Sequence, residues 1–370
     1  MMTKELIQAL TFTMPVVCSL VCLVIMLLDI FATKKNKEDR KLRLYLSLTF
    51  AVIALSWFSL VLFDAFHTVF AGCFSIFLLS MMFNQILIYH FIHIITDVGR
   101  QDRFSQLHLV VPALLMTFSL VTDVIVPLPQ KEAVIYGSSE GSHLFSILYT
   151  LTAVAAFMYY TVYPSLAFLR IRHYRRSIEN YSADTQRNSL NWIVILQILT
   201  LIFIPVPFSG LLLHVELFTK MIFSIMAALV AFIYYPIFCY NLISDNYVII
   251  APDDEALPDH HAAEIDTRRF IQYIREKKPY LNPHLRVTHV AYDMCTNRNY
   301  LSAFINHTYG MNFSRFINRY RLRELDSLRH SPDCKANTNM ELVLMAGFSS
   351  YRSYLRVKKR EDTAKTLKAF

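Results

Sequence analysis

Polar, basic and aromatic side chains recur at helical spacing between Asn297 and Leu322. Positions three or four apart share one face of a helix, so Arg298, Asn299, Ser302 and Asn306 are expected to lie together. Asparagine can form two hydrogen bonds with adenine, and arginine can do the same with guanine. One polar residue on an outer helix face is usually just solvated, but the set as a whole predicts contacts to base edges of DNA.

The opposite face of the same helix is apolar, because Leu301, Phe304 and Ile305 recur there. We expect these side chains to pack against Val290 and Ala291 of a preceding helix. Such packing would turn the polar face outward.

The tail of the chain contains this helix–turn–helix pattern twice. A short apolar helix is predicted at RVTHVAYDM, a turn at CTN and a more polar helix at RNYLSAFINHTY; NMELVLMAGF and SSYRSYLRVKKRED repeat the order. The amphipathic segment NFSRFINRYRLRELDSLRH joins the two units. In a helix–turn–helix motif the second helix lies in the major groove of DNA.

The segment VTHVAYDMCTNRNYLSAFINHTYGMNFSRFINRYRLRELDSL, followed by AGFSSYRSYLRVKK, resembles the DNA-binding domain of the AraC family of bacterial transcription regulators. The match covers roughly Phe270 to Lys359. The resemblance implies a double helix–turn–helix that binds double-stranded DNA, and it says nothing about the signal. Its anchors are Leu301, Gly310, Met311, the run from Asn318 to Leu322, and the run from Ala346 to Phe348.

The same resemblance assigns residues to the second unit. Phe348 and Tyr354 would pack inward, and the reading face would hold Tyr351, Arg352, Ser353 and Arg356. Lys358 and Lys359 stand where the family usually has an apolar anchor followed by lysine. We therefore expect this unit to contact phosphates, through Arg356, Lys358 and Lys359, more than bases.

Charge agrees with a polyanionic partner for the tail. Residues 264–370 contain 20 Lys and Arg against 10 Asp and Glu. This excess is typical of proteins that bind phosphates. It is also compatible with an ordinary solvated surface, or with attraction to an anionic membrane leaflet.

The remainder of the chain is strongly apolar, since the whole sequence is 55% hydrophobic with a mean hydropathy of +0.37. About 20 apolar residues in a helix cross a bilayer. The sequence predicts an all-α protein, in which a polytopic bundle of seven membrane spans precedes the small all-helical tail. The spans are expected near residues 6–31, 42–63, 70–96, 104–126, 143–169, 190–213 and 220–243.

Loop charges predict the orientation of the spans. With the amino terminus outside, the inner loops hold 13 Lys and Arg, whereas the amino terminus and outer loops hold Lys4, Lys131 and Lys220. Cytoplasmic loops are enriched in Lys and Arg, so this split places the tail in the cytoplasm and the chain in the inner membrane. We expect a membrane domain at 1–243, an acidic linker at 244–263 and a DNA-binding domain at 264–370.

Polar residues in the third span form a candidate sensory site, because such groups are costly in lipid. His90, His93 and Asp97 share a face at spacings of three and four, beside Asn84 and Gln85. A metal or proton site is conceivable there. Hydrogen bonding between helices is the commoner reason for such groups, and we expect no bound metal.

These patterns predict a membrane-integrated regulator of transcription that acts as a homodimer on adjacent half-sites. The bilayer and double-stranded DNA are its expected partners, together with an unidentified small molecule or envelope signal. The tail has only Gly310 and Gly347, so it lacks a glycine-rich phosphate loop, and we expect neither enzymatic activity nor a cofactor. The alternative is a seven-helix receptor or transporter whose tail docks a protein partner.

Overall fold

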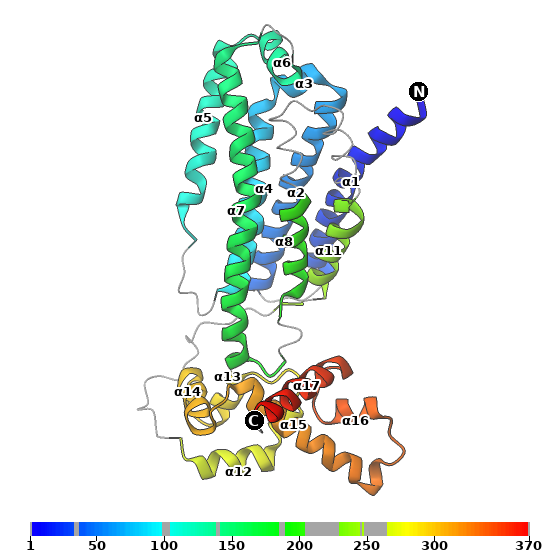
Figure 1. Ribbon diagram of the computed structural model, residues 1–370, viewed down its shortest axis with the longest axis vertical. Coiled ribbons are helices and arrows are strands. Elements are labelled where there is room, and N and C mark those ends of the chain that lie inside the picture. Colours follow the sequence, from blue (N-terminus) through cyan, green and yellow to red (C-terminus); the bar gives the residue numbers. More distant parts are fainter. Residues whose placement is uncertain are drawn as a thin grey trace. The chain divides into compact units, whose positions relative to one another are not determined.

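The structure is a computed structural model that describes residues 2–32, 37–97, 104–137, 141–184, 189–203, 229–244, 246–247 and 265–368. Over these residues it is all-α, as predicted, and its sole extended pairing is a bridge between Ser182 and Arg286. Two compact units account for the chain (Figure 1). Unit 1 comprises residues 1–95, 102–171 and 190–246, and unit 2 comprises residues 96–101, 172–189 and 247–370.

Unit 1 is built mainly from long apolar helices. Five described helices are long and apolar enough to cross a membrane, and they lie at Thr13–Phe31, Asp39–Phe63, Phe74–Thr96, Gln106–Ile125 and His143–Tyr181. Its elements are α1 (Met2–Ala32), α2 (Lys37–Ala65), α3 (His67–Gly72), α4 (Phe74–Thr96), η1 (Gln106–Leu109), α5 (Val110–Ile125), α6 (Leu128–Tyr136), α7 (His143–Tyr181), α8 (Asn191–Phe203), η2 (Val230–Tyr234) and α11 (Tyr235–Ile243).

The first five predicted spans are therefore helical, with two changes of detail. The third begins at Phe74, because His67–Gly72 forms the separate short helix α3. The predicted outer loop before α7 contains the helix α6. Of the sixth and seventh predicted spans, the structure describes α8, η2 and α11, while residues 204–228 and most of the predicted linker lie outside the described residues.

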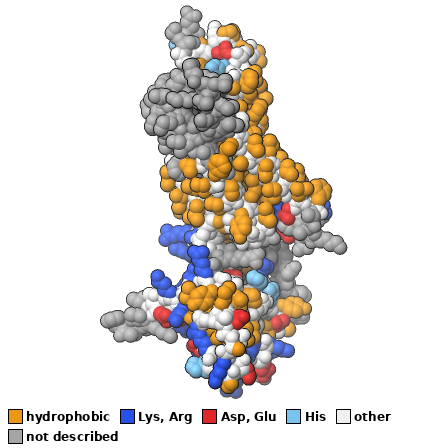
Figure 2. Space-filling view, turned by 90° about the vertical axis from the view of Figure 1, so that its right-hand side faces the viewer, with side chains coloured by type: hydrophobic (Ala, Val, Ile, Leu, Met, Phe, Trp, Pro, Cys, Tyr) orange, Lys and Arg blue, Asp and Glu red, His pale blue; other side chains and the backbone are white. Residues whose placement is uncertain are grey.

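The face of unit 1 seen in Figure 2 is largely apolar, since hydrophobic side chains predominate over its described residues there. Leu44, Val124 and Leu169 are among the large hydrophobic side chains that are more than half exposed. A water-soluble protein rarely exposes so large an apolar surface. This surface is suited to contact with lipid.

Unit 2 is a set of shorter helices that begin at well-defined caps. Asp266, Asn297 and Asn312 accept backbone hydrogen bonds at the starts of α12, α14 and α15, which satisfies amides that have no partner within the helix. The helices of the tail are α12 (Thr267–Lys277), η4 (Pro279–Leu281), α13 (Val287–Asp293), α14 (Arg298–Tyr309), α15 (Phe313–His330), η5 (Pro332–Cys334), α16 (Asn339–Met345) and α17 (Tyr351–Lys368). They match the predicted order.

The division into units differs from the predicted domains in two places, because residues 96–101 and 172–189 of the predicted membrane domain fall in unit 2. A boundary between Asn246 and Tyr247 lies close to the predicted end of the membrane part. Residues 172–189, which include the last turns of α7, belong with the tail, however. The sequence predicts instead that they belong to the membrane domain at 1–243.

Candidate functional site

The first helix–turn–helix unit consists of α13, a turn and α14. Val290 and Ala291 of α13 are buried, as are Leu301 and Ile305 of α14, so the predicted packing face is confirmed. Phe304 is half-buried, with its ring 5.3 Å from that of Phe270 in an edge-on arrangement.

The turn ends where the side-chain oxygen of Asn297 accepts a hydrogen bond from the amide of Tyr300 at 2.9 Å. This cap fixes the point at which α14 begins. As a result, the predicted reading positions fall in the first turns of a well-formed helix.

The predicted reading face, defined as Arg298, Asn299, Ser302 and Asn306, is only partly open to solvent. Asn299 and Asn306 are exposed, whereas Arg298 and Ser302 are half-buried. The Ser302 hydroxyl donates to the backbone oxygen of Asn180 at 3.4 Å. Sequence reasoning missed this contact, because Asn180 lies more than a hundred residues earlier.

The second helix–turn–helix unit consists of α16, a turn and α17. Phe348 and Tyr354 are buried with ring centroids 5.6 Å apart, which confirms the predicted inward packing. They belong to an apolar cluster with Leu325, Leu342 and Val343. This cluster anchors α17 on α15 and α16.

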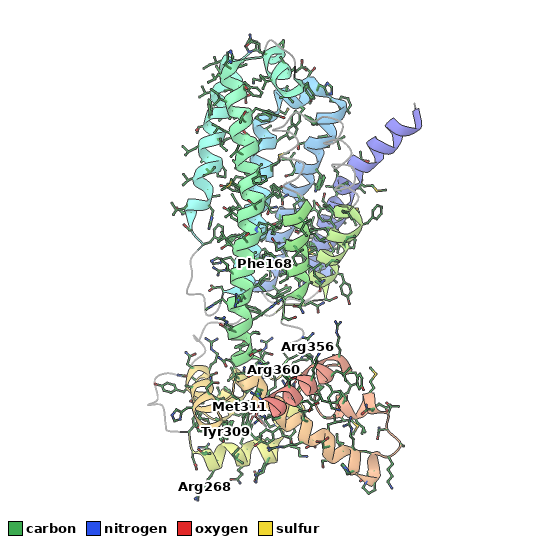
Figure 3. All side chains as sticks on the ribbon, viewed as in Figure 1. Phe168, Arg268, Tyr309, Met311, Arg356 and Arg360 are labelled. Carbon is green, nitrogen blue, oxygen red and sulfur yellow. The ribbon has the colours of Figure 1, made fainter. Side chains whose placement is uncertain are left out.

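The predicted contact residues of α17 fall into two groups. Arg352, Arg356, Lys358 and Lys359 are exposed, and Figure 3 shows Arg356 on the same helix as Arg360. Ser353 is buried, and its hydroxyl donates to the Ser350 carbonyl at 2.8 Å. Tyr351 is half-buried, and its hydroxyl accepts from the Asn339 amide at 3.2 Å. Ser353 therefore supports the helix start, and α17 presents mainly cations.

Arg321 of the predicted family anchor is an internal structural cation. It is 2% exposed and donates to the carbonyls of Tyr280 at 2.8 Å and Asn282 at 2.7 Å, and to Asn318 Oδ1 at 3.2 Å. Burial lowers its pKa to about 10, and the nearby Asp184 carboxylate acts in the opposite direction. Arg321 therefore organises the tail and is too deeply buried to reach DNA.

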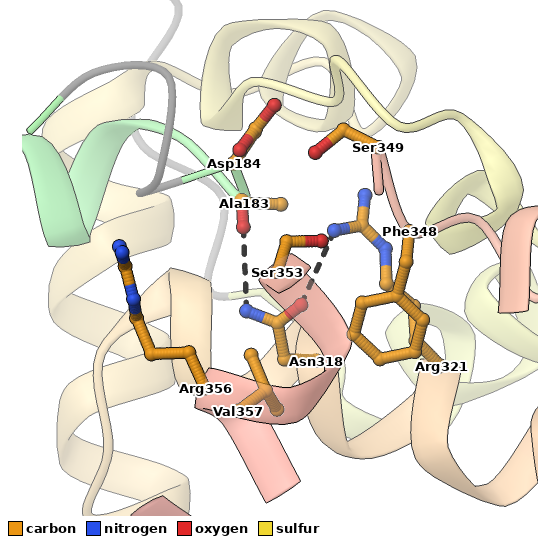
Figure 4. A pocket seen from close by; sticks show the side chains of 9 residues that line it. All are labelled: Ala183, Asp184, Asn318, Arg321, Phe348, Ser349, Ser353, Arg356 and Val357. Atoms are coloured by element: carbon orange, nitrogen blue, oxygen red, sulfur yellow. Dashed lines mark hydrogen bonds between the residues drawn. The ribbon is translucent and has the colours of Figure 1, made fainter. Parts of the chain in front are cut away.

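A small cavity adjoins Arg321 (Figure 4). Asn318 spans it, with Nδ2 donating to the Ala183 carbonyl at 3.3 Å. Asp184, Ser353 and Arg356 also line it. Its volume of about 20 Å³ is enough for a water molecule but not for a substrate.

The predicted sensory residues lie in α4 and just after it. Asn84, Gln85 and His93 are buried, and His90 and Asp97 are half-buried. Asn84 Nδ2 lies 3.4 Å from the hydroxyl of Tyr160 on α7. Hydrogen bonding between helices, which the sequence reasoning favoured, therefore accounts for at least one member of the set.

The rings of His90 and His93 lie against Phe104, which the sequence had not singled out. Their centroids are 4.3 and 5.6 Å from that ring. His108 joins the same ring at 4.7 Å and lies 3.0 Å from the Tyr163 hydroxyl. Histidine and aromatic side chains from α4, η1 and α7 thus form one cluster. The sequence position of His108 does not indicate that it belongs to this cluster, because the fold is what brings it close to His90 and His93.

Among the described residues, no group of three or more His, Cys, Asp and Glu is arranged to hold a metal ion.

Two buried ion pairs change how the loop charges are understood. Lys131, counted above as an outer-loop residue, is 4% exposed in α6, and its Nζ lies 2.5 Å from Asp123 Oδ1. Asp123 also accepts a hydrogen bond from Ser75. At the start of α2, Arg43 Nε lies 3.1 Å from Asp29. These charges hold helices together, so they carry less information about topology than exposed loop charges do.

Comparison with known proteins gave no similarity on which to base a function: no family model matches the chain, and neither a curated protein nor a solved structure does so at a significant level.

Proposed function

We propose that this chain is a membrane-integrated transcription regulator, whose membrane part senses a signal and whose tail binds double-stranded DNA. The observation that carries the proposal is the repeated helix–turn–helix construction of unit 2. In each unit a buried apolar face positions a second helix with polar or basic side chains outward. This is the arrangement by which such motifs present a helix to the major groove.

The two outward faces suit different parts of a DNA duplex. Asn299 and Asn306 are exposed on α14, and amide side chains pair well with adenine. Arg352, Arg356 and Lys359 follow one another at spacings of four and three on α17, so their charges project from one side of that helix. Cations of this kind contact phosphates and fix register without reading sequence.

The proposal includes a topology and an assembly. The amino terminus would lie outside and the tail in the bacterial cytoplasm, as the exposed loop charges favour. Association of two copies would place two reading heads beside each other on adjacent half-sites and raise their effective concentration. The cluster around Phe104 is the candidate sensory site, and a small molecule or an envelope signal is the expected stimulus.

A second candidate function is a receptor or transporter whose tail docks a protein. One observation favours it. Met340, Leu344 and Met345 of α16 and Leu355 of α17 are 44–58% exposed, which gives the second unit a hydrophobic surface. Exposed apolar patches mark protein interfaces more often than DNA interfaces.

Selection from a random DNA library separates the two functions. The full chain, held in nanodiscs of uncharged lipid, would be mixed with duplexes of random sequence at moderate salt, and bound duplexes would be sequenced over several rounds. We expect one sequence pattern to be enriched, with two half-sites about one helical turn, or a multiple of it, apart. Binding without any enrichment would indicate a general polyanion surface, and failure to bind would favour the docking function.

A further inference from the structure

The last turn of α7 and the residues after it are built into the tail. We define the α7 end as Glu179–Asp184, which lies in unit 2 although residues 143–171 of the same helix lie in unit 1. Tyr181, Ala183 and Asp184 are each at most 5% exposed. The α7 end is therefore part of the packed tail and not an open loop.

The α7 end is anchored through its last residues. The Ala183 amide donates to the Leu285 carbonyl at 3.0 Å, and the Ala183 carbonyl accepts from Asn318 at 3.3 Å. Asp184 Oδ2 lies 3.9 Å from His284 Nδ1. This anchor ties the end of the helix to the base of the first helix–turn–helix unit.

The residues before the anchor cover half of the reading face. Ser302 donates to the Asn180 carbonyl, and the guanidinium of Arg298 lies 5.8 Å from the centre of the Tyr181 ring. Arg286 lies 6.0 Å from the same ring. A guanidinium over an aromatic ring is attracted by the ring's negative face. DNA would have to displace Asn180 and Tyr181 to contact the Ser302 hydroxyl and the face of the Arg298 guanidinium that lies over the ring.

Glu179 extends the cover to the second unit. Its carboxylate accepts from Arg360 Nη1 at 3.0 Å and Nη2 at 3.3 Å, and from Asn312 Nδ2 at 2.7 Å. Arg360 lies one turn after Arg356 on α17 (Figure 3). A guanidinium binds carboxylate and phosphate with the same paired geometry, so Glu179 occupies a cation that DNA phosphates would attract.

We infer that the α7 end is an autoinhibitory element, which competes with DNA for both helix–turn–helix units. This inference rests on the proposed function. Because α7 is one continuous helix from His143 to Tyr181, a movement of its membrane part changes how firmly Glu179–Tyr181 cover the reading face. The hydrogen bonds of Ala183 keep Glu179–Tyr181 near the reading face, so these residues can cover it again when the signal ends.

The ion pair between Glu179 and Arg360 is weak enough for DNA to displace it. The Glu179 and Arg360 side chains are 31% and 55% exposed, so solvent screens their attraction. Exposed pairs of this kind shift an equilibrium by at most about fivefold. Removing the Glu179 charge should therefore release part of the inhibition without unfolding the tail.

The test uses the full chain in nanodiscs of uncharged lipid, with a fluorescent DNA duplex of random sequence as the probe. Glu179→Gln should bind the duplex about three- to fivefold more tightly than the wild-type chain, since a smaller share of molecules is covered. Glu276→Gln is the matched control, because Glu276 is exposed on α12 and bonds to Gln272 instead of the α7 end. It should match the wild type.

Hydrogen exchange provides a second measurement that needs no variant. Adding the duplex to the wild-type chain should speed amide exchange in the α7 end and slow it in α14. If the wild type binds DNA while the α7 end keeps its protection, or if Glu179→Gln binds no better than Glu276→Gln, the inference is wrong and the proposed function stands. If neither the wild type nor Glu179→Gln binds DNA at low salt, the proposed function fails and the inference fails with it.

Discussion

The two helix–turn–helix units share a scaffold but differ in what they present. The first exposes the amide groups of Asn299 and Asn306 on α14, whereas the second exposes the Arg and Lys side chains of α17. Amides accept and donate in fixed directions and can distinguish bases, while flexible cations mainly attract phosphates. If the tail binds DNA as proposed, the first unit is therefore expected to contact bases and the second unit to contact phosphates.

The turns of the two units also differ. In the first, Cys295 adopts a left-handed conformation with φ of 54°, although it is not glycine. In the second, Gly347 has φ of 90° and lies against the backbone of Tyr280 and Leu281. The first turn therefore tolerates a side chain, and the second has no room for one.

Gly347→Ala should have the largest effect, on the second unit. An added Cβ would lie 2.3 Å from the Tyr280 carbonyl oxygen and 2.7 Å from Leu281 Cα, and backbone atoms cannot move aside cheaply. We expect a loss of about 3 kcal/mol or more of tail stability. The measurement is the temperature at which protease begins to cleave the tail of the full chain.

Gly310→Ala is the matched control. Gly310 also has a positive φ, of 62°, but a Cβ there would meet nothing within 4 Å. Only backbone strain of about 1 kcal/mol is expected. Both Trp residues, Trp57 and Trp192, lie in unit 1, so their fluorescence reports whether the membrane part is unchanged. Equal losses for the two glycine variants would contradict the difference between the turns.

If the tail binds DNA as proposed, Asn299→Ala should change the base preference of the first unit. Loss of a two-bond contact to adenine costs about 1 to 3 kcal/mol and relaxes preference at one base pair. Thr308→Ala is the control, because Thr308 is exposed about two and a half turns further along α14, on the opposite side of the helix from Asn299. Selection from random duplexes by each variant measures the preference. An unchanged pattern for Asn299→Ala would mean that another face of α14 meets the DNA.

Local patterns predicted much of unit 2 and less of its contacts. Apolar spacing and turn residues located α14 and α15 correctly, because both signals lie within the helix or directly beside it. The burial of Arg321 and the cover of Ser302 by Asn180 depend on residues that are distant in the sequence. Neither spacing nor charge encodes such a contact.

Unit 1 shows the same limit. Hydropathy located its long helices. For polar residues such as His90 and Lys131, however, the sequence did not indicate which side chains they contact. Phe104 and Asp123 supply those partners from other helices or loops. The sequence therefore predicted the residues of the candidate sensory site that lie on α4, but not the cluster of rings around Phe104.

Glu361→Gln should weaken the attachment of α17 to α15. The Glu361 carboxylate accepts from Arg315 Nε at 2.5 Å and Arg319 Nε at 3.0 Å. Burial raises its pKa, but these hydrogen bonds outweigh burial and hold the pKa below its ordinary value of 4.5. At neutral pH we expect the variant to lose about 1 kcal/mol of tail stability.

The stability difference between the wild type and Glu361→Gln should depend on pH. A carboxyl group whose folded pKa is depressed stabilises the fold above its unfolded pKa, and this stabilisation is lost as the pH falls through the folded value. The stabilities of the wild type and Glu361→Gln should therefore begin to converge as the pH falls below 4.5, and should coincide below the lowered folded pKa. Protease cleavage temperatures measured across the pH range test this, with Glu276→Gln as the control. A difference that stayed constant down to acid pH would show that the charge of Glu361 is not the cause.

Lys359→Ala should have the smallest effect, which is on DNA affinity. It is the most direct test of the prediction that the second unit contacts phosphates. Lys359 is exposed on α17, so its removal should leave the fold unchanged. A lost phosphate contact lowers the slope of log affinity against log salt by about one and weakens all sequences alike. Titrations of the full chain with the selected duplex and a scrambled duplex at several salt concentrations give both quantities.

Lys335→Ala is the control for this variant. Lys335 carries the same charge and is exposed in the turn between α15 and α16, outside α14 and α17. If Lys359→Ala altered preference between the two duplexes, the second unit would also read bases, and the division between the two units would have to be given up.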